Sequence, residues 1–539
     1  MHKRIMFLLI ALTVSISGVL AKASPPTQSS TGDSFGTSTV GPSGGEPSIA
    51  TALDGTLYIS YPGGAGMAFY ASHNDGKTWK AGGIADPGSG DTTVNTDSSG
   101  AIYQGNLNDN TEGDVWKSID GGKHWTKGVV ANPSVFTTVD GDSATDSPFL
   151  MDREWTDAYI PAGKTTDDAR VYIGYHDFVP SFIWVNTSKD GGKTFGSQVN
   201  VITDPVALAN SFCNTIPGGL KVVQSGPHAG RVYVAWLAGS VATNAATGCN
   251  ETQLDTFGQI WMAWSDDEGA TWTDKLVYDA GFGRDASAIF ADLALDKAGN
   301  PYVAWTLNGA PPHTGASGDQ WDIYVSASFD NAASFIAPVK VTSDVGTHFF
   351  PAIAAGDPGR VVVAYISTPS VIPQLPYGKP FPGEDPNAKW YVYLSRSLNL
   401  NAASPTWVQE KLTPNAIHTG DVCTLGIFCL PGQLIGIQNR DLLDFIDVVM
   451  DPAGMVHVAY GNTEAKPGKT VVQATSQLTG VPLLKKIIQK VHIPKVRKPV
   501  KTRVLGEKLA GTGVGEAPFA GLILLLLAAA LMRAFRRRA

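Results

Sequence analysis

A box of eight residues recurs four times along the chain, and this repeat constrains the fold more than any other feature of the sequence. Its copies read SHNDGKTW (72–79), SIDGGKHW (118–125), SKDGGKTF (188–195) and SDDEGATW (265–272). Each copy has a serine, an Asn or Asp two positions later, a glycine and a final aromatic residue at fixed offsets. Four near-copies indicate a chain that is built from one repeated structural unit.

The residue types of the box indicate a structural role at a tight turn. The Asn or Asp side chain can accept hydrogen bonds from turn amides, the glycine supplies a positive φ, and the aromatic ring can fill the core between units. The residues with these roles are Ser72, Asn74, Gly76, Trp79, Ser118, Asp120, Gly122, Trp125, Ser188, Asp190, Gly192, Phe195, Ser265, Asp267, Gly269 and Trp272. Degenerate copies follow at 328–335, where Ala332 replaces the glycine, and at 397–407, which has an insertion.

Seven strand-like runs define the rest of the unit. They lie at 57–61, 101–105, 170–175, 231–236, 301–305, 360–365 and 455–460, and they are rich in β-branched and aromatic residues. Most follow a glycine-containing turn that is itself preceded by an apolar strand. Four-stranded units repeated radially make a β-propeller. The sequence therefore predicts an all-β propeller of seven four-stranded blades, with six blades and one irregular hairpin as the alternative.

The box resembles the Asp-box of the sialidase superfamily, also called the bacterial neuraminidase repeat, over about residues 45–480. The resemblance implies a propeller with a site at one mouth of its central channel. The same box is found in non-enzymatic propellers and in glycosidases of other specificities, so it implies a fold more strongly than an activity. Sialidases hold the sugar acid with three arginines and use a Tyr–Glu pair as nucleophile and an Asp as acid/base.

Three arginines precede inferred inner strands in alternate units: Arg153, Arg284 and Arg440. If they converge, the resemblance implies that they bind one carboxylate through charge-assisted hydrogen bonds. Alternatively, each arginine pairs with a neighbouring acid and fixes a loop. The family's first arginine stands in an Arg-Ile-Pro-like motif ahead of the first box, where this chain has Glu46 in the stretch GEPSI (45–49). That departure weighs against sialidase activity.

Carboxylates near the expected starts of inner strands are further candidates for the site. Glu46, Asp292 and Asp444 are the acids that we expect at a ligand site, and Asp91 and Asp157 occupy similar positions. His176, at the end of a second strand, is expected either to reach the same mouth or to be a hydrogen-bonded loop residue. The sequence assigns a catalytic role to none of these residues, because carboxylates at such positions commonly cap turns and loops.

Both ends of the chain have the composition of targeting segments. Residues 1–23 combine basic residues, an apolar run and a small-residue cleavage site, which predicts a signal peptide and export. Residues 24–44 are expected to be a linker, 45–480 the propeller, and 481–516 a basic stalk with nine Lys or Arg against two Glu. Residues 517–539 combine an apolar run with terminal arginines, which predicts a transmembrane or sorting segment and a protein anchored at the extracellular face of the membrane.

Charge and cysteine content narrow the possible partners. The chain has a net charge of −8 although both ends are basic, and an acidic domain argues against nucleic acid as a partner. The cysteines Cys213, Cys249, Cys423 and Cys429 predict two disulfides in an exported protein, with 423–429 and 213–249 as the expected pairs. Their spacing does not support a metal site, and no cofactor is expected.

Three functions remain open from the sequence. The first is a propeller that binds a glycan or a cell-surface protein at the channel mouth, and the missing first arginine favours it. The second is an exo-α-sialidase-type glycoside hydrolase, which the three arginines favour. The third is a structural or adhesive surface protein, which the stalk and the membrane segment favour. Whether the protein is an enzyme is left open.

Overall fold

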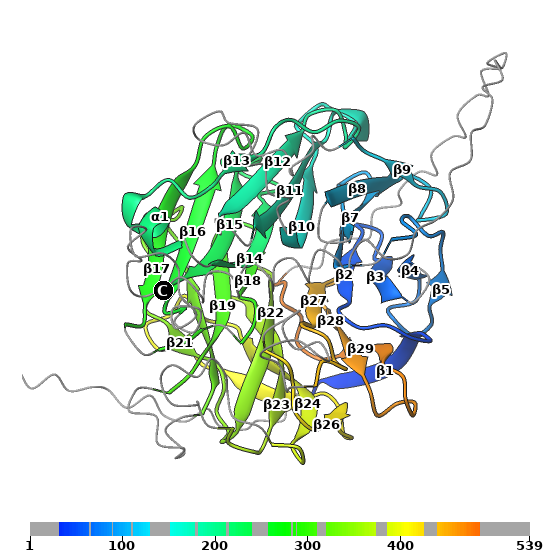
Figure 1. The fold of residues 1–539 in the computed structure, drawn as a ribbon, viewed down its shortest axis with the longest axis vertical. Helices are drawn as coiled ribbons and strands as arrows, with labels where there is room; N and C mark the ends of the chain where they lie inside the picture. Colours follow the sequence, from blue (N-terminus) through cyan, green and yellow to red (C-terminus); the bar gives the residue numbers. More distant parts are fainter. Residues whose placement is uncertain are drawn as a thin grey trace, which may run out of the picture. The chain divides into compact units, whose positions relative to one another are not determined.

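The computed structural model describes residues 32–485, apart from residues 64–65, 89, 109–111, 130–150, 178–181, 212–214, 240–256, 282–283, 287, 310–319, 373–384 and 425–438. The chain divides into two compact units, residues 1–495 and 496–539, and the described residues all belong to the first. In that unit, seven antiparallel sheets are arranged around a central axis (Figure 1). This confirms the all-β propeller and its seven blades, and it excludes the alternative of six.

Each blade runs from an inner strand at the axis to an outer strand at the rim. Blade 1 contains β2 (Ser48–Thr51), β3 (Leu57–Gly63), β4 (Gly66–Ser72) and β5 (Lys80–Ala81), and blade 2 contains β6 (Thr92–Thr96), β7 (Ile102–Asn108), β8 (Glu112–Ser118) and β9 (Thr126–Lys127). Blade 3 contains β10 (Met151–Tyr159), β11 (Arg170–Asp177), β12 (Ile183–Ser188) and β13 (Val199–Asn200), and blade 4 contains β14 (Thr215–Val222), β15 (Val232–Ala238), β16 (Gln259–Ser265) and β17 (Thr273–Asp279).

The remaining blades follow the same order. Blade 5 contains β18 (Asp292–Leu295), β19 (Pro301–Leu307), β20 (Asp322–Ala327) and β21 (Val339–Lys340). Blade 6 contains β22 (Thr347–Ala355), β23 (Val361–Thr368), β24 (Lys389–Ser397) and β25 (Val408–Lys411), and β26 (His418–Thr419) also pairs with β24. Blade 7 contains β27 (Asp447–Met450), β28 (Val456–Asn462), β29 (Val471–Thr479) and β1 (Ser34–Gly41). A short 3-10 helix η2 (Thr166–Asp168) and helix α1 (Pro205–Ser211) lie between strands.

The two ends of the described chain close the propeller, and both differ from the predicted boundaries. Strand β1, which the sequence places in the linker 24–44, pairs with β29 and completes blade 7. Its sequence alternates small and β-branched residues, which is a strand pattern, but no box or glycine turn accompanies it, so the repeat does not reveal this strand. Residues 481–485, predicted as the start of the stalk, pack against blades 6 and 7, and Leu483 is fully buried. The Leu483 N–H donates to Gly454 O (2.8 Å), and its carbonyl accepts from Asp357 N–H (3.1 Å).

A buried ion pair fastens these two ends together. Arg396 Nη2 contacts Asp33 Oδ2, and the two side chains are 5% and 0% exposed. Arg396 Nη1 also donates to the carbonyl of Val481 (3.0 Å), and the Val481 N–H donates to Asp33 Oδ1 (2.8 Å). We call this group the terminal clasp. It ties the residues just before β1 to those just after β29.

The boxes form turns that bring neighbouring blades together. In the second box, Ser118 Oγ donates to Asp120 Oδ1 (3.0 Å) and accepts from the Gly122 N–H (2.9 Å). The Trp125 ring lies edge-on against Phe69 of blade 1, with 5.0 Å between ring centroids. The aromatic residue of this box therefore packs against the preceding blade. In the degenerate box, Ala332 keeps the same turn with a φ of 68°.

Three inner strands have β-bulges near their starts, close to the channel axis. The register shifts between Asp152 and Trp155 in β10, between Pro217 and Leu220 in β14, and between Phe349 and Ala352 in β22. In two of these bulges a non-glycine residue has left-handed backbone geometry, Arg153 with φ 42° and Phe350 with φ 58°. Because a bulge changes the direction in which a side chain points, the bulge in β10 allows Arg153 to face the channel axis.

Several predictions fall outside the described residues and stay predictions. These concern the signal peptide 1–23, the rest of the stalk 486–516 and the segment 517–539. Within the described part of the chain, no helix has the length and apolar character needed to cross a membrane. Cys423 is buried and is not a free thiol, whereas Cys213, Cys249 and Cys429 lie outside the described residues, so the disulfide pairing also stays a prediction.

Candidate functional site

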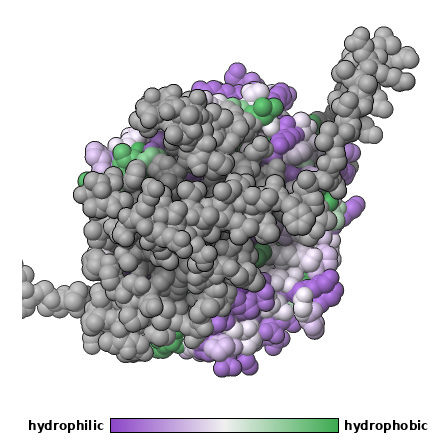
Figure 2. Space-filling view, viewed as in Figure 1, coloured by the Kyte–Doolittle hydropathy of each residue, from purple (hydrophilic) through white to green (hydrophobic). Residues whose placement is uncertain are grey.

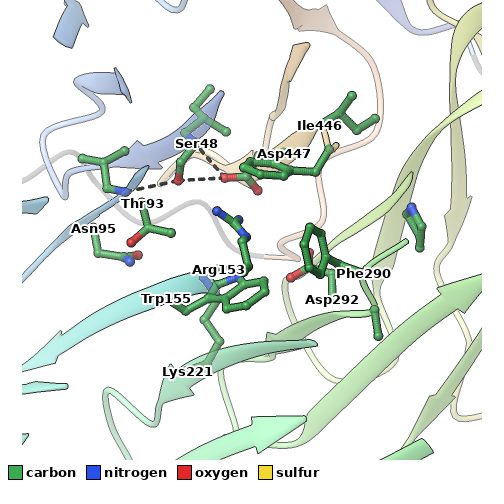
Figure 3. Close-up of a pocket in the computed structure, with 15 residues that line it drawn as sticks. Ser48, Thr93, Asn95, Arg153, Trp155, Lys221, Phe290, Asp292, Ile446 and Asp447 are labelled. Carbon is green, nitrogen blue, oxygen red and sulfur yellow. Dashed lines mark hydrogen bonds between the residues drawn. The ribbon is translucent and has the colours of Figure 1, made fainter. Parts of the chain in front are cut away.

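All seven blades contribute to one pocket on the channel axis, which we call the axial pocket (Figure 3). One lining residue from each blade, in blade order, is Ser48, Thr93, Arg153, Lys221, Asp292, Pro351 and Asp447. The pocket has a volume of about 40 Å³, which is room for a few water molecules or for one small charged group. It therefore lies where the inner strands of the seven blades converge on the channel axis.

The guanidinium of Arg153 is the central group of the axial pocket. Arg153 is 5% exposed, and its Cζ lies 3.7 Å from the ring centroid of Phe445 and 4.3 Å from that of Trp155. Its Nε and Nη1 have no hydrogen-bond partner among the described residues. Each unmet buried donor costs about 1–3 kcal/mol, and contact with the aromatic rings offsets only part of that cost. A desolvated cation with free N–H groups is a strong attractor of an anion.

Three aspartates on alternate blades surround the channel axis, and we call them the axial aspartates. Asp157 Oδ2 accepts from the Val222 N–H, Asp292 Oδ2 from the Ile353 N–H, and Asp447 Oδ2 from the Ile49 N–H, each at 2.8 Å. In every case the donor belongs to the inner strand of the next blade. The other oxygen accepts from the N–H of the following residue, at distances of 2.7–2.8 Å. These carboxylates hold adjacent inner strands together.

Burial raises the pKa of all three axial aspartates. The pKa of Asp292 rises to about 7, because the charge of Asp447 adds to the effect of burial. For each of the three, the positive charge of Lys221 opposes the rise. Lys221 lies on β14 and also lines the axial pocket. One lysine therefore acts as the shared counter-charge of three carboxylates from three blades.

The predicted residues Arg440, Glu46 and Asp444 form an ion-pair group that does not line the axial pocket. Arg440 Nη2 contacts Asp444 Oδ2 and lies 3.4 Å from Glu46 Oε1. The Asp444 N–H donates to Glu46 Oε1 (3.0 Å). Burial and the charge of Asp91 raise the pKa of Glu46. Arg440 is therefore paired with acids, as in the alternative that the sequence left open, although these acids are not the one adjacent to it in the sequence.

Arg284, the remaining predicted arginine, is also absent from the lining of the axial pocket. It lies beside Tyr324 in β20, where burial raises the pKa of the tyrosine and Arg284 opposes the rise. Of the predicted ligand-binding residues, the structure brings Arg153 and Asp292 into one pocket. It places Arg440, Glu46 and Asp444 together in another group, and Arg284 apart from both.

A further acidic group lies next to Arg153. Glu154 is fully buried, and neither carboxylate oxygen has a hydrogen-bond partner among the described residues. Burial raises its pKa to about 8, and the charge of Asp91 adds to the rise. Burial and the charge of Asp152 raise the pKa of Asp91 to about 6. His176 Nε2 lies 3.8 Å from Asp152 Oδ2. Carboxyls whose pKa values are raised to different extents are typical of acid–base sites.

Several residues of the site were not singled out from the sequence. They are Trp155, Lys221, Phe290, Phe445, Asp447 and Glu154. For Asp447 a signal existed, since DVVM (447–450) matches DLAL (292–295) at the start of an inner strand. Lys221 has no comparable signal, because the bulge in β14 decides which way it faces. Among the described residues, no group of three or more His, Cys, Asp or Glu side chains could hold a metal ion.

Comparisons with known proteins give only distant similarities. No protein-family model matches the chain, and no curated protein matches it. A solved protein of unknown function from Dyadobacter fermentans is 13% identical, with 82% of this chain and 97% of that chain covered and a TM-score of 0.42. An ulvan lyase of polysaccharide lyase family PL25 is 13% identical, with 81% and 95% covered and a TM-score of 0.46. The intramolecular trans-sialidase from Ruminococcus gnavus is 13% identical, with 79% and 93% covered and a TM-score of 0.36. Similarities this low support no conclusion about the fold or the function of this chain, which are argued from its own residues.

Proposed function

We propose that the axial pocket binds the carboxylate of an acidic sugar, and that the protein is an exported glycan-binding propeller. The observation that carries the proposal is the buried Arg153 guanidinium with its unpartnered Nε and Nη1. Aromatic rings crowd this guanidinium, so an anion has to reach it at a free N–H edge. A carboxylate suits such an edge because it accepts two parallel N–H bonds.

The size and charge of the surroundings favour a charged group on a larger polar ligand. A pocket of about 40 Å³ accepts the carboxylate and leaves the sugar ring at the mouth. Where described residues are visible in Figure 2, mainly along its right and lower edges, most of them are hydrophilic and the apolar areas are small. Because the propeller region is acidic, an anionic ligand needs a local cation such as Arg153 to bind at all.

Titration calorimetry with three sugars tests the proposal. N-acetylneuraminic acid and glucuronic acid should bind, and neutral glucose should not. Arg153→Met should weaken binding of both acids by at least about tenfold, since the main cation is lost. Arg170→Met is the matched control, because Arg170 pairs with Glu268 (2.7 Å) away from the pocket. Equal binding of glucose and the two acids, or unchanged binding by R153M, would refute the proposal.

A glycoside hydrolase is the second candidate, and the acids beside Arg153 favour it. Asp91 and Glu154, with pKa values raised to about 6 and about 8, offer one base and one acid near neutral pH. Glu46 replaces the family's first arginine and contacts Arg440, so a sialidase-type arginine triad is not part of this candidate. Release of N-acetylneuraminic acid from sialyllactose, abolished by Glu154→Gln, would support hydrolysis; binding without release would leave the binding function alone.

A further inference from the structure

The axial pocket places Asp447 within the influence of two cations. Burial raises the pKa of Asp447. The positive charge of Lys221 opposes this rise most strongly, and the charge of Arg153 opposes it to a smaller extent. In Figure 3, Arg153 lies between Trp155 and Asp447. Despite this position, Arg153 forms no ion pair with Asp447, and its Nε and Nη1 stay unpartnered within the described residues.

The oxygens of Asp447 are already occupied. Oδ2 accepts from the Ile49 N–H (2.8 Å) and from Ser48 Oγ (3.2 Å), and Oδ1 accepts from the Val448 N–H (2.7 Å). These bonds orient the carboxylate toward neighbouring backbone, but neutral donors leave its charge in place. Lys221 lines the same pocket and supplies the opposing charge to all three axial aspartates. Its charge therefore acts on the axial aspartates as a group.

We propose that Lys221 is a positioning residue, which neutralises the axial aspartates and so prevents Asp447 from capturing Arg153. The guanidinium is thereby left free for the carboxylate of a ligand. The identity of that ligand rests on the proposed function, whereas the relation between Lys221, Asp447 and Arg153 does not. Without Lys221, Arg153 is the remaining pocket residue whose positive charge acts on Asp447, and an internal ion pair would compete with the external anion.

The test measures whether one substitution weakens binding of glucuronic acid and whether a second substitution restores it. Lys221→Met should weaken binding of glucuronic acid roughly tenfold. Adding Asp447→Asn should restore most of that loss, because the amide carries no charge that could hold Arg153 and its oxygen still accepts one backbone N–H. Lys221→Arg should keep the affinity of the unaltered protein. Lys189→Met is the matched control, since Lys189 pairs with Glu268 at the surface (2.8 Å), and it should bind as the unaltered protein does.

Crystal structures of the ligand-free variants decide the same point independently of any sugar. In K221M, a nitrogen of Arg153 should lie within hydrogen-bond distance of an Asp447 oxygen, and in K221M/D447N it should not. If K221M does not fold, D447N alone should bind glucuronic acid at least as tightly as the unaltered protein.

The inference is overturned if K221M/D447N binds as weakly as K221M, which would mean that Lys221 contacts the ligand directly. An Arg153 that stays unpaired in K221M would overturn it as well. Absence of sugar binding by the unaltered protein would refute the proposed function and leave the structural test valid.

Discussion

A buried guanidinium with two unpartnered nitrogens is unusual at the scale of a single residue, because contact with the aromatic rings offsets only part of the cost of burying it. If Arg153 served the fold, its removal would leave partners unsatisfied and lower the free energy of unfolding by about 3–5 kcal/mol. Since Nε and Nη1 have no described partners, we expect the opposite. Arg153→Met should leave the free energy of unfolding unchanged or raise it by about 1–3 kcal/mol, as measured by urea denaturation. A marked loss of stability would show that Arg153 has a structural role and would remove it as the ligand anchor.

At the scale of the element, the box turns hold adjacent blades in contact. Gly121 and Gly122 both have positive φ, 76° and 80°, but only at Gly122 does an added Cβ meet Phe69 of blade 1, at 2.0 Å. Gly121→Ala should therefore lower the free energy of unfolding by about 1–2 kcal/mol, the cost of the backbone conformation alone. Gly122→Ala should cost about 1–3 kcal/mol more through overpacking. Equal losses in chemical denaturation would mean that the turn does not pack tightly against blade 1.

The terminal clasp provides a second prediction at this scale. Arg396→Met leaves the buried Asp33 carboxylate without its counter-charge, so we expect the free energy of unfolding to fall by about 3–5 kcal/mol. Arg170→Met removes a more exposed ion pair and should cost less than about 1 kcal/mol. Thermal denaturation of both variants measures the difference. If R396M were as stable as R170M, the ring would be closed by the strand pairing of β1 and β29 alone.

At the element scale, the sequence predicts well those features that a short stretch of residues determines. The boxes and glycine turns are local patterns, and they predicted the repeated unit and the seven blades. The site depends instead on contacts between distant residues: Arg153 meets Phe290 and Phe445 only because three blades converge. The place of Arg284 before a strand predicts that it faces the site, yet it lies eight residues ahead of Asp292, where β18 begins, and it contacts Tyr324 instead. Pairing of Arg440 with Glu46 likewise depends on closure of the ring.

For the whole molecule, the raised pKa values predict an unusual dependence of stability on pH. The pKa values of Asp91, Asp292 and Glu154 are raised to about 6, 7 and 8, above those of carboxyls in an unfolded chain, about 4. The folded state therefore binds these protons more tightly. The resulting stability is complete below about pH 4 and is lost as the pH rises through 6 to 8, so the melting temperature should fall across this range.

Two variants test which carboxyl causes the fall of the melting temperature with pH. Asp292→Asn should flatten the part of the slope near pH 7, because it removes the proton that is taken up there. Asp120→Asn is the control. Burial acts to raise the pKa of Asp120, but hydrogen bonds from His124 outweigh it and lower this pKa to about 2, which lies below the range of pH 4 to 8. A melting temperature that is flat, or that rises, from pH 4 to pH 8 in the unaltered protein would contradict the raised pKa values.

The central claim concerns one carboxylate at one guanidinium, and a crystal structure of the protein soaked with glucuronic acid tests it most directly. We predict that the sugar carboxylate lies in the axial pocket, with an oxygen about 2.7–2.9 Å from Arg153 Nε or a terminal guanidinium nitrogen, and with the sugar ring at the channel mouth. A carboxylate bound instead at Arg284 or Arg440, or an axial pocket that contains only water while the sugar binds elsewhere, would contradict the claim.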